Sequence, residues 1–200
     1  LHTGLYTDMK AIRKDEEVDE IHSLYVEQWD WEKVISKEDR TVDYLKQTVT
    51  SIYKAIRQTS LMLKQKYRFL ELTLPKTVYF ITSQELEEMY PKFDSKEREE
   101  KITKEKKAVF IIGIGDKLKS GKPHDGRAPD YDDWSLNGDI LVYSDVLEDV
   151  IVFLSVGMIL RVNVCRKISF VKRDLVKYLI HLKSTLILIG FRCFKSSKLI

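Results

Sequence analysis

The chain has 200 residues, of which 44% are hydrophobic and 32% are charged, and this balance excludes a disordered segment and favours a globular domain. Its length suits one domain with a core of its own. The net charge of +3 is unevenly distributed, because residues 151–200 contain ten lysines and arginines but one acidic residue, Asp174. A nucleic-acid-binding function would therefore depend on that C-terminal segment alone.

Two features bear on the compartment of the protein. Cys165 and Cys193 lie in neither metal-binding nor redox spacing, which favours a reducing, cytoplasmic environment. The apolar run at residues 180–194 is interrupted by Lys183 and is shorter than the ~20 residues that a membrane helix needs. The chain begins at Leu1 and shows no signal peptide, and we expect its native N-terminus to be missing.

The N-terminal segment predicts two extended strands joined by a charged turn at residues 14–20. In the second strand, Gln28 and Asp30 share one face, whereas Trp29 and Trp31 share the other. Tryptophans beside carboxylates lower the local dielectric constant and suit a site for a polar ligand. A solvated acidic segment with tryptophans anchored in the core explains the same pattern.

Residues 41–67 carry apolar side chains at helical spacing and predict a long amphipathic helix that lies on a sheet. Residues 78–81 are apolar on both faces, which predicts a buried strand. Ser83 is a candidate N-cap for a short helix that Pro91 ends. These elements predict a scaffold, and we assign no chemistry to them.

Residues 94–97 have the form of a capping box and predict a helix that continues to about residue 107 with a solvated, charged surface. The following run, residues 108–114, predicts a fully buried strand. Gly113 and Gly115 do not form a phosphate-binding loop, because the lysine and hydroxyl of such a loop do not follow in register. We interpret them as points where the backbone closely approaches a neighbour or a ligand.

The stretch 126–134 places one guanidinium, that of Arg127, and three carboxylates close together between two predicted strands. Pro129 forces the residue before it into an extended conformation, which favours an ordered loop. Loops held between rigid strands are common places for binding groups. The next predicted strand covers residues 140–143 and is preceded by Asp139.

These stretches together resemble ammonia-dependent asparagine synthetase, also called aspartate ammonia ligase. The order of the blocks matches that family, and the resemblance covers about residues 4–150. It implies an α+β fold with an antiparallel sheet flanked by helices, class II aminoacyl-tRNA synthetase-like and incomplete. We expect residues 1–150 to be a partial asparagine synthetase catalytic domain. The blocks that carry the resemblance are residues 4–13, 22–32, 83–86, 108–115, 127–135 and 136–142.

The resemblance implies a cytoplasmic, ATP-dependent ligase that forms asparagine from aspartate and ammonia through a β-aspartyl adenylate, releasing AMP and pyrophosphate. ATP and Mg²⁺ would be required, and the complete protein would be a homodimer. The roles that the resemblance assigns are ATP phosphate binding and catalysis for Arg13, aspartate binding for Gln28 and Asp30, substrate carboxylate binding for Arg127, aspartate binding and catalysis for Asp132, and magnesium binding for Asp139.

Residues 151–200 depart from this family. They are only partly similar to the next sequence block of the family and lack its acidic metal ligand. They also lack the last ATP-binding arginine of the family. The segment shows no clean helical or strand period, so we interpret it as a divergent basic tail, frameshifted or mis-joined. Its scattered charges among aliphatic residues disfavour a nucleic-acid partner. The alternative to the ligase is an inactive synthetase-like fragment that acts as an aspartate- or nucleotide-binding or regulatory module.

Overall fold

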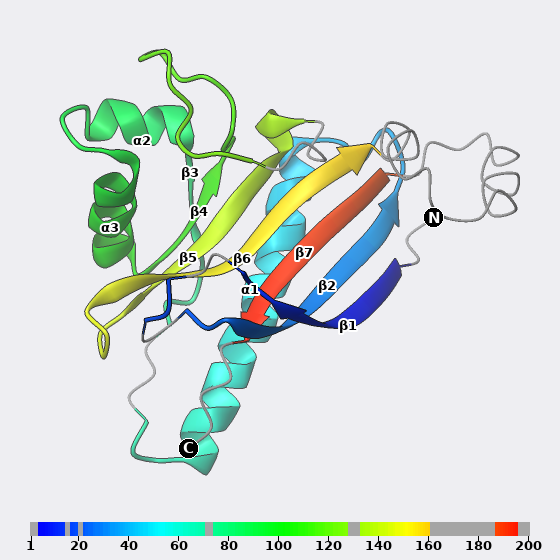
Figure 1. Cartoon of the computed structure of the whole chain (residues 1–200), viewed down its shortest axis with the longest axis vertical. Helices are drawn as coiled ribbons and strands as arrows, with labels where there is room; N and C mark the ends of the chain where they lie inside the picture. The colour runs from blue at the N-terminus through cyan, green and yellow to red at the C-terminus, as the bar shows by residue number, and fades with distance from the viewer. Residues whose placement is uncertain are drawn as a thin grey trace, which may run out of the picture. The chain divides into compact units, whose positions relative to one another are not determined.

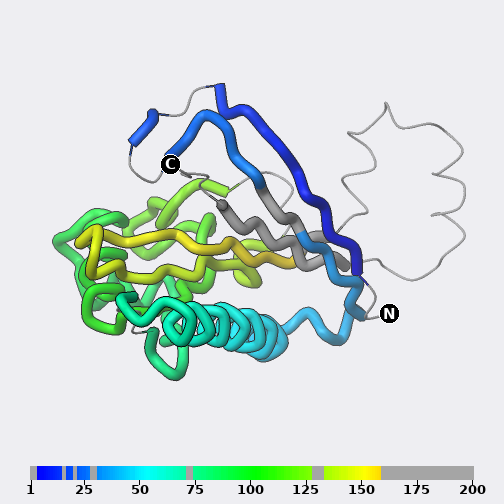
Figure 2. Tube along the Cα trace, turned by 90° about the horizontal axis from the view of Figure 1, so that it is seen from below, coloured from blue at the N-terminus to red at the C-terminus, as the bar shows by residue number. Residues whose placement is uncertain are grey.

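The structure is a computed structural model that describes residues 4–14, 17–19, 22–70, 74–127, 133–160 and 187–195, with the backbone alone described for residues 28–30, 159, 160 and 187–195. The chain divides into two compact units. Figures 1 and 2 show the elements of the chain. Unit 1 comprises residues 1–40, 128–133 and 154–200, and unit 2 comprises residues 41–127 and 134–153. Strand β6, Asp149–Leu160, contributes residues to both units.

Unit 1 is built on an antiparallel sheet with the strand order β1-β2-β7-β6. Strands β1, Gly4–Ile12, and β2, Tyr25–Ile35, pair along the whole length of β1 and confirm the predicted hairpin (Figure 1). Strand β7, Ile187–Lys195, pairs with β2 on one side and with β6 on the other.

The sequence analysis missed both strands of the C-terminal segment. Apolar side chains in β6 occupy both faces at Ile151 through Leu154, which removes the alternation by which a half-buried strand is recognised. The structure buries Leu154 and the three successive residues from Val156 to Met158, so burial in β6 does not alternate cleanly either. The boundary expected at residue 150 falls within β6, and the division into a catalytic domain and a tail stays a prediction.

Unit 2 places helices on strands in the order β6-β5-β4-β3. All five residues of β4, Ala108–Ile112, are buried, as predicted, and β4 pairs antiparallel with β5, Asn137–Ser144. Strand β3, Tyr79–Thr82, pairs parallel with β4. The prediction of a buried strand at residues 78–81 is wrong at Tyr79, which is 39% exposed, and in the described part of the chain β3 pairs with β4 alone.

The predicted long helix is α1, Val42–Lys66, whose buried residues Leu45, Val49 and Tyr53 follow the predicted helical spacing. It lies along one face of the unit 2 strands (Figure 2). The Thr41 side chain caps α1 by accepting a hydrogen bond from the Tyr44 backbone N–H at 3.1 Å.

Two shorter helices complete unit 2. Helix α2, Ser83–Met89, is capped by Thr82 rather than by Ser83, because Thr82 forms a capping box with Glu85. Helix α3, Ser95–Lys106, begins with the capping box predicted for Asp94 and Glu97. A 3₁₀ turn, η1, covers Trp134–Leu136. The core shared by these helices and the strands contains Ile81, Leu86, Ile102, Val109, Ile111, Ile114 and Leu141.

The observed elements confirm the α+β class and the mainly antiparallel pairing. Among the described residues, the structure contains no helix that is both long and apolar enough to cross a membrane.

Candidate functional site

The hairpin of β1 and β2 carries three of the predicted site residues in unit 1. Arg13 follows β1 directly, and its backbone N–H donates to the Leu24 carbonyl at 2.7 Å, so it continues the hairpin by one step. Arg13 is partly buried. Gln28 and Asp30 lie two residues apart on β2 and therefore share a face of the sheet. Their side chains lie outside the described part of the structure.

Arg127 and Asp139 form an ion pair in unit 2. Nη2 of Arg127 donates to Oδ2 of Asp139 at 2.5 Å, and each side chain is only 11% exposed. Asp139 lies on β5 opposite Ile111 of β4, so two buried strands hold it in place. Its second oxygen, Oδ1, is buried and has no hydrogen-bond partner among the residues that the structure describes. The sequence analysis gave these two residues separate roles, and the structure brings them into contact.

Gly115 makes room for Arg127. Its φ of +108° is rare for residues with a side chain, and a Cβ there would lie 3.0 Å from Cγ of Arg127 and 3.1 Å from Cγ of Trp134. Gly113 also has a positive φ, and its N–H donates to the Asn137 carbonyl at 2.8 Å. The prediction that these glycines mark close approaches of the backbone is confirmed for Gly115, where the neighbour includes a site residue.

A compact hairpin, residues 116–126, precedes Arg127. A bridge joins Lys117 to Pro123, and the Leu118 N–H donates to the Lys122 carbonyl at 3.0 Å. At the base of this hairpin, the fully buried ring of His124 forms a 2.8 Å hydrogen bond between its Nε2 and Oε1 of Glu99 on α3. The sequence analysis did not identify this contact, since a histidine in a polar loop carries no periodic signal.

Asp132 lies outside the described residues, so its predicted role is not tested. The adjacent Asp133 belongs to unit 1 and accepts a hydrogen bond from Nη2 of Arg40 at 3.4 Å. One carboxylate of the acidic loop is therefore paired with an arginine from the segment between β2 and α1, which the sequence analysis did not single out.

Comparison with known proteins assigns the family. The family model for aspartate-ammonia ligase matches residues 1–173. The chain belongs to the aspartate-ammonia ligase family. It is 57% identical over 155 residues to the aspartate–ammonia ligase of Clostridium tetani, covering 78% of this chain and 46% of that protein. It is 56% identical over 159 residues to that of Lactobacillus johnsonii, covering 79% and 47%. The chain spans about half the length of these relatives.

Solved structures confirm the aminoacyl-tRNA synthetase-like fold expected for the aspartate-ammonia ligase family. Asparaginyl-tRNA synthetase from Pyrococcus horikoshii, complexed with asparaginyl-adenylate, matches with a TM-score of 0.57 at 14% identity, covering 95% of this chain and 47% of that one. Aspartyl-tRNA synthetase from Entamoeba histolytica matches with a TM-score of 0.51 at 17% identity, covering 96% and 43%. At these identities the likeness shows the fold alone.

The donor atoms of unit 2 can be compared with those that the magnesium ion expected for an aspartate-ammonia ligase prefers. The described residues contain no cluster of three or more histidine, cysteine, aspartate and glutamate side chains that could hold a metal ion. Magnesium is commonly bound by one or two carboxylates together with substrate phosphates and water, so such a cluster is not required. Oδ1 of Asp139, buried and without a hydrogen-bond partner, is an oxygen of the type that magnesium prefers. Asp139 therefore fits a single-carboxylate contribution.

Proposed function

We propose that this protein is an ATP-dependent ligase that converts aspartate and ammonia into asparagine. The observation that carries the proposal is the fixed guanidinium of Arg127, buried against Asp139 and Gly115, within a chain whose family is aspartate-ammonia ligase. A guanidinium held in this way presents directed donors to a planar carboxylate. Residues 1–150 would form the partial catalytic domain, and residues 151–200 a divergent tail.

The reaction has two steps in which bonds and charges balance. In the first, a β-carboxylate oxygen of aspartate attacks the α-phosphorus of ATP, the bond between the α- and β-phosphates breaks, and pyrophosphate leaves. In the second, the nitrogen of ammonia attacks the β-carbonyl carbon of the adenylate, nitrogen loses one proton, and AMP leaves with the electrons of the broken C–O bond. The first step brings two anions together, so fixed cationic donors lower its barrier, and oriented reactants lower the barriers of both steps.

Arg127 serves this reaction as the group that binds a substrate carboxylate. A guanidinium has five N–H donors, so Arg127 can keep its contact with Asp139 while it donates to a bound carboxylate. The contact with Asp139 fixes the plane of the guanidinium before substrate arrives. This preorganisation reduces the entropy that binding must otherwise supply.

The remaining roles follow the family resemblance. Arg13 would donate to the α-phosphate of ATP, for which a planar guanidinium is better suited than an ammonium group. Gln28 and Asp30 would hold aspartate, the latter through its α-amino group. Asp132 would bind that amino group or attract ammonium. Asp139 would contribute Oδ1 to Mg²⁺, which would supply positive charge beside the phosphates. We also propose that the complete protein is a cytoplasmic homodimer.

The test is aspartate-dependent exchange of pyrophosphate into ATP by the protein expressed from its complete gene. We expect Arg13→Ala to abolish exchange, because the variant loses the phosphate contact, and Arg68→Ala to leave exchange unchanged, because Arg68 is an exposed residue beyond α1. Exchange that persists in Arg13→Ala would remove the phosphate role. A protein that binds aspartate or ATP without any exchange would instead be the binding or regulatory module.

A further inference from the structure

One buried carboxylate outside the proposed site, that of Glu87 on α2, contacts the tip of the hairpin that precedes Arg127. We infer that Glu87 is a positioning residue: it fixes the hairpin at residues 116–126 to α2 and so sets the place of Arg127. The inference rests on the proposed function, since it takes Arg127 to bind the substrate carboxylate. It adds a residue that the reaction needs but that touches neither substrate nor Asp139.

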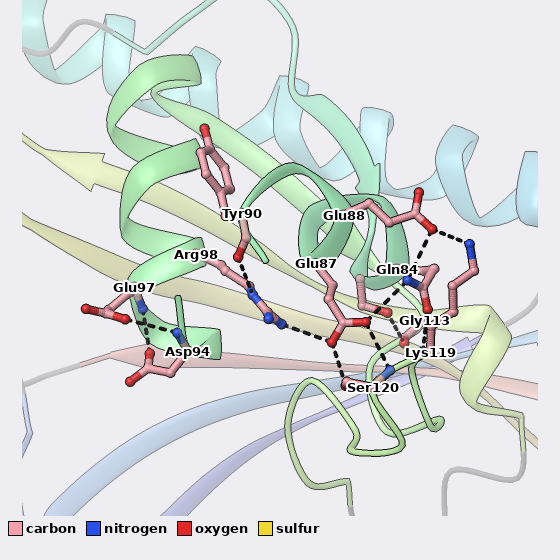
Figure 3. Close-up of polar contacts among 11 residues, drawn as sticks. Gln84, Glu87, Glu88, Tyr90, Asp94, Glu97, Arg98, Gly113, Lys119 and Ser120 are labelled. Carbon is pink, nitrogen blue, oxygen red and sulfur yellow. Dashed lines mark hydrogen bonds and ion pairs between the residues drawn. The ribbon is translucent and has the colours of Figure 1, made fainter. Parts of the chain in front are cut away.

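Glu87 is 8% exposed and accepts hydrogen bonds at both carboxylate oxygens. The Ser120 hydroxyl donates to Oε1 at 2.6 Å and the Ser120 N–H to Oε2 at 3.4 Å (Figure 3). Gln84 Nε2 also donates to Oε2, at 3.3 Å. The hydrogen bond from the Ser120 hydroxyl is the main cause that lowers the pKa of Glu87. At neutral pH the tip of the hairpin is therefore held by a buried, charged acceptor, which makes stronger hydrogen bonds than a neutral one.

The neighbouring residue of the hairpin is held by the same helix. The Lys119 N–H donates to Oε1 of Gln84 at 2.8 Å, and the Lys119 ammonium group pairs with Oε1 of Glu88 (Figure 3). Gln84, Glu87 and Glu88 are three and four residues apart, which places them on one face of α2. Two successive residues at the hairpin tip are thus fastened to one helical face.

Arg98 of α3 orients Glu87 from the other side. Its Nη1 donates to Oε1 of Glu87 at 3.4 Å, and its Nε donates to the Tyr90 carbonyl at 3.1 Å (Figure 3). The side chains of Arg98 and Glu87 are 11% and 10% exposed. Because Arg98 holds both Glu87 and the C-cap residue of α2, the carboxylate faces Ser120 in a fixed direction.

Because the hairpin is itself held together, restraining its tip also restrains the position of Arg127. Its two arms are joined between Leu118 and Lys122, and Leu118 is buried. The base of the hairpin is fixed separately, where His124 contacts Glu99 of α3. Two anchors define the orientation of a short paired segment, whereas one anchor lets it rotate. Without the contact at Glu87, the tip would be held to α2 through Lys119 alone, so the hairpin would turn more easily about His124 and displace Arg127, three residues further on.

The first measurement is hydrogen–deuterium exchange at the backbone amides of residues 117–127, apart from Pro123, which has no N–H. Ser120→Ala removes the 2.6 Å contact while leaving Arg98 and Gln84 on Glu87, so it loosens the hairpin without leaving a buried charge unpaired. We expect faster exchange at Gly126 and Arg127 in Ser120→Ala, and near-normal exchange in Ser120→Thr, which keeps the hydroxyl. The control is Ser51→Ala, which removes a hydroxyl bonded to the Gln47 carbonyl within α1.

The second measurement is the steady-state kinetics of the same variants, made in the protein expressed from its complete gene. We expect Ser120→Ala to lower kcat/KM for aspartate by roughly tenfold or more, since misplacing a positioning group by about 1 Å costs up to about 100-fold. The KM for ATP should not change. In an Arg127→Lys background, Ser120→Ala should add no further loss, because Glu87 acts through Arg127.

Each outcome decides the inference. Unchanged exchange at Gly126 and Arg127 in Ser120→Ala overturns it, whatever the activity. Faster exchange with an unchanged kcat/KM for aspartate, or a loss that persists in the Arg127→Lys background, overturns it as well. If the unmodified protein turns over no aspartate, the proposed function fails, and faster exchange at Arg127 still supports the positioning by Glu87.

Discussion

The ion pair of Arg127 and Asp139 allows a quantitative test of how the site is built. Arg127→Met removes the charge and keeps much of the aliphatic volume, but it leaves the buried carboxylate of Asp139 without its partner at Oδ2. Its other oxygen already lacks a hydrogen bond within the structure. Removing one member of a buried pair costs about 3–5 kcal/mol. Each side chain keeps 11% of its surface exposed, so water offsets part of this cost, and we expect a loss near the lower end, about 3 kcal/mol.

The pair should behave as one unit. Asp139→Asn alone leaves the arginine buried without its counter-charge, and we expect a loss of about 3 kcal/mol here too. The double variant Arg127→Met/Asp139→Asn contains no unpaired charge at this position. Its loss should therefore fall short of the sum of the two single losses by about 2 kcal/mol, as is typical of residues in direct contact.

Urea-induced unfolding followed by circular dichroism at neutral pH measures these differences. The matched control is Asp145→Asn, which breaks the ion pair of Lys107 and Asp145, whose side chains are 39% and 60% exposed. Exposed pairs contribute at most about 1 kcal/mol, so this control should change little. A loss in Arg127→Met no larger than that of the control, or strict additivity in the double variant, would refute the description of a buried, coupled pair.

Two further predictions test the packing of unit 2. Gly115→Ala should destabilise the protein by about 2–4 kcal/mol, because it adds backbone strain and overlaps with Arg127. Gly121→Ala, also at positive φ but with no atom within 4 Å, should be destabilised by the strain alone. Equal losses of stability in urea unfolding would contradict the contact with Arg127. Burial raises the pKa of Tyr53 to about 12. The free energy of unfolding should therefore fall as pH rises from about 10 to about 12, since the unfolded state loses its phenolic proton first. Tyr53→Phe should lack this share of the fall, and identical pH dependences in the two proteins would show that Tyr53 contributes none of it.

The sequence predicted those elements whose formation depends on local signals. Helix α3 begins where the residues of its capping box stand, and α1 extends over the run of helical spacing. The cap of α2 was placed one residue too late, because Thr82 and Ser83 both have a side-chain hydroxyl and only the structure shows which one caps. There the Ser83 hydroxyl instead donates to the Gly113 carbonyl at 2.6 Å.

Contacts between residues distant in the sequence could not be predicted in this way. Arg127 and Asp139 are 12 residues apart, and the register of β4 with β5 sets the position of one of them. Glu87 belongs to a short helix with three glutamates, a composition that is typical of an exposed helix, yet Glu87 is buried. Its role depends on a hairpin that follows 33 residues later. The family resemblance pointed to Arg127 and Asp139 individually and gave no information on what holds them.

The arrangement around Arg127 favours recognition by geometry over recognition by charge. Arg127 and Asp139 together are formally neutral, so their combined attraction for a distant anion is weak. What the pair offers a carboxylate is a guanidinium of fixed orientation, held by Gly115 on one side and by a hairpin fastened to α2 on the other. A lysine at this position would keep the charge but lose the planar set of donors. On the proposed role of Arg127, the polar contacts that fasten the hairpin matter because they fix an orientation, and apolar burial alone would not fix it as narrowly.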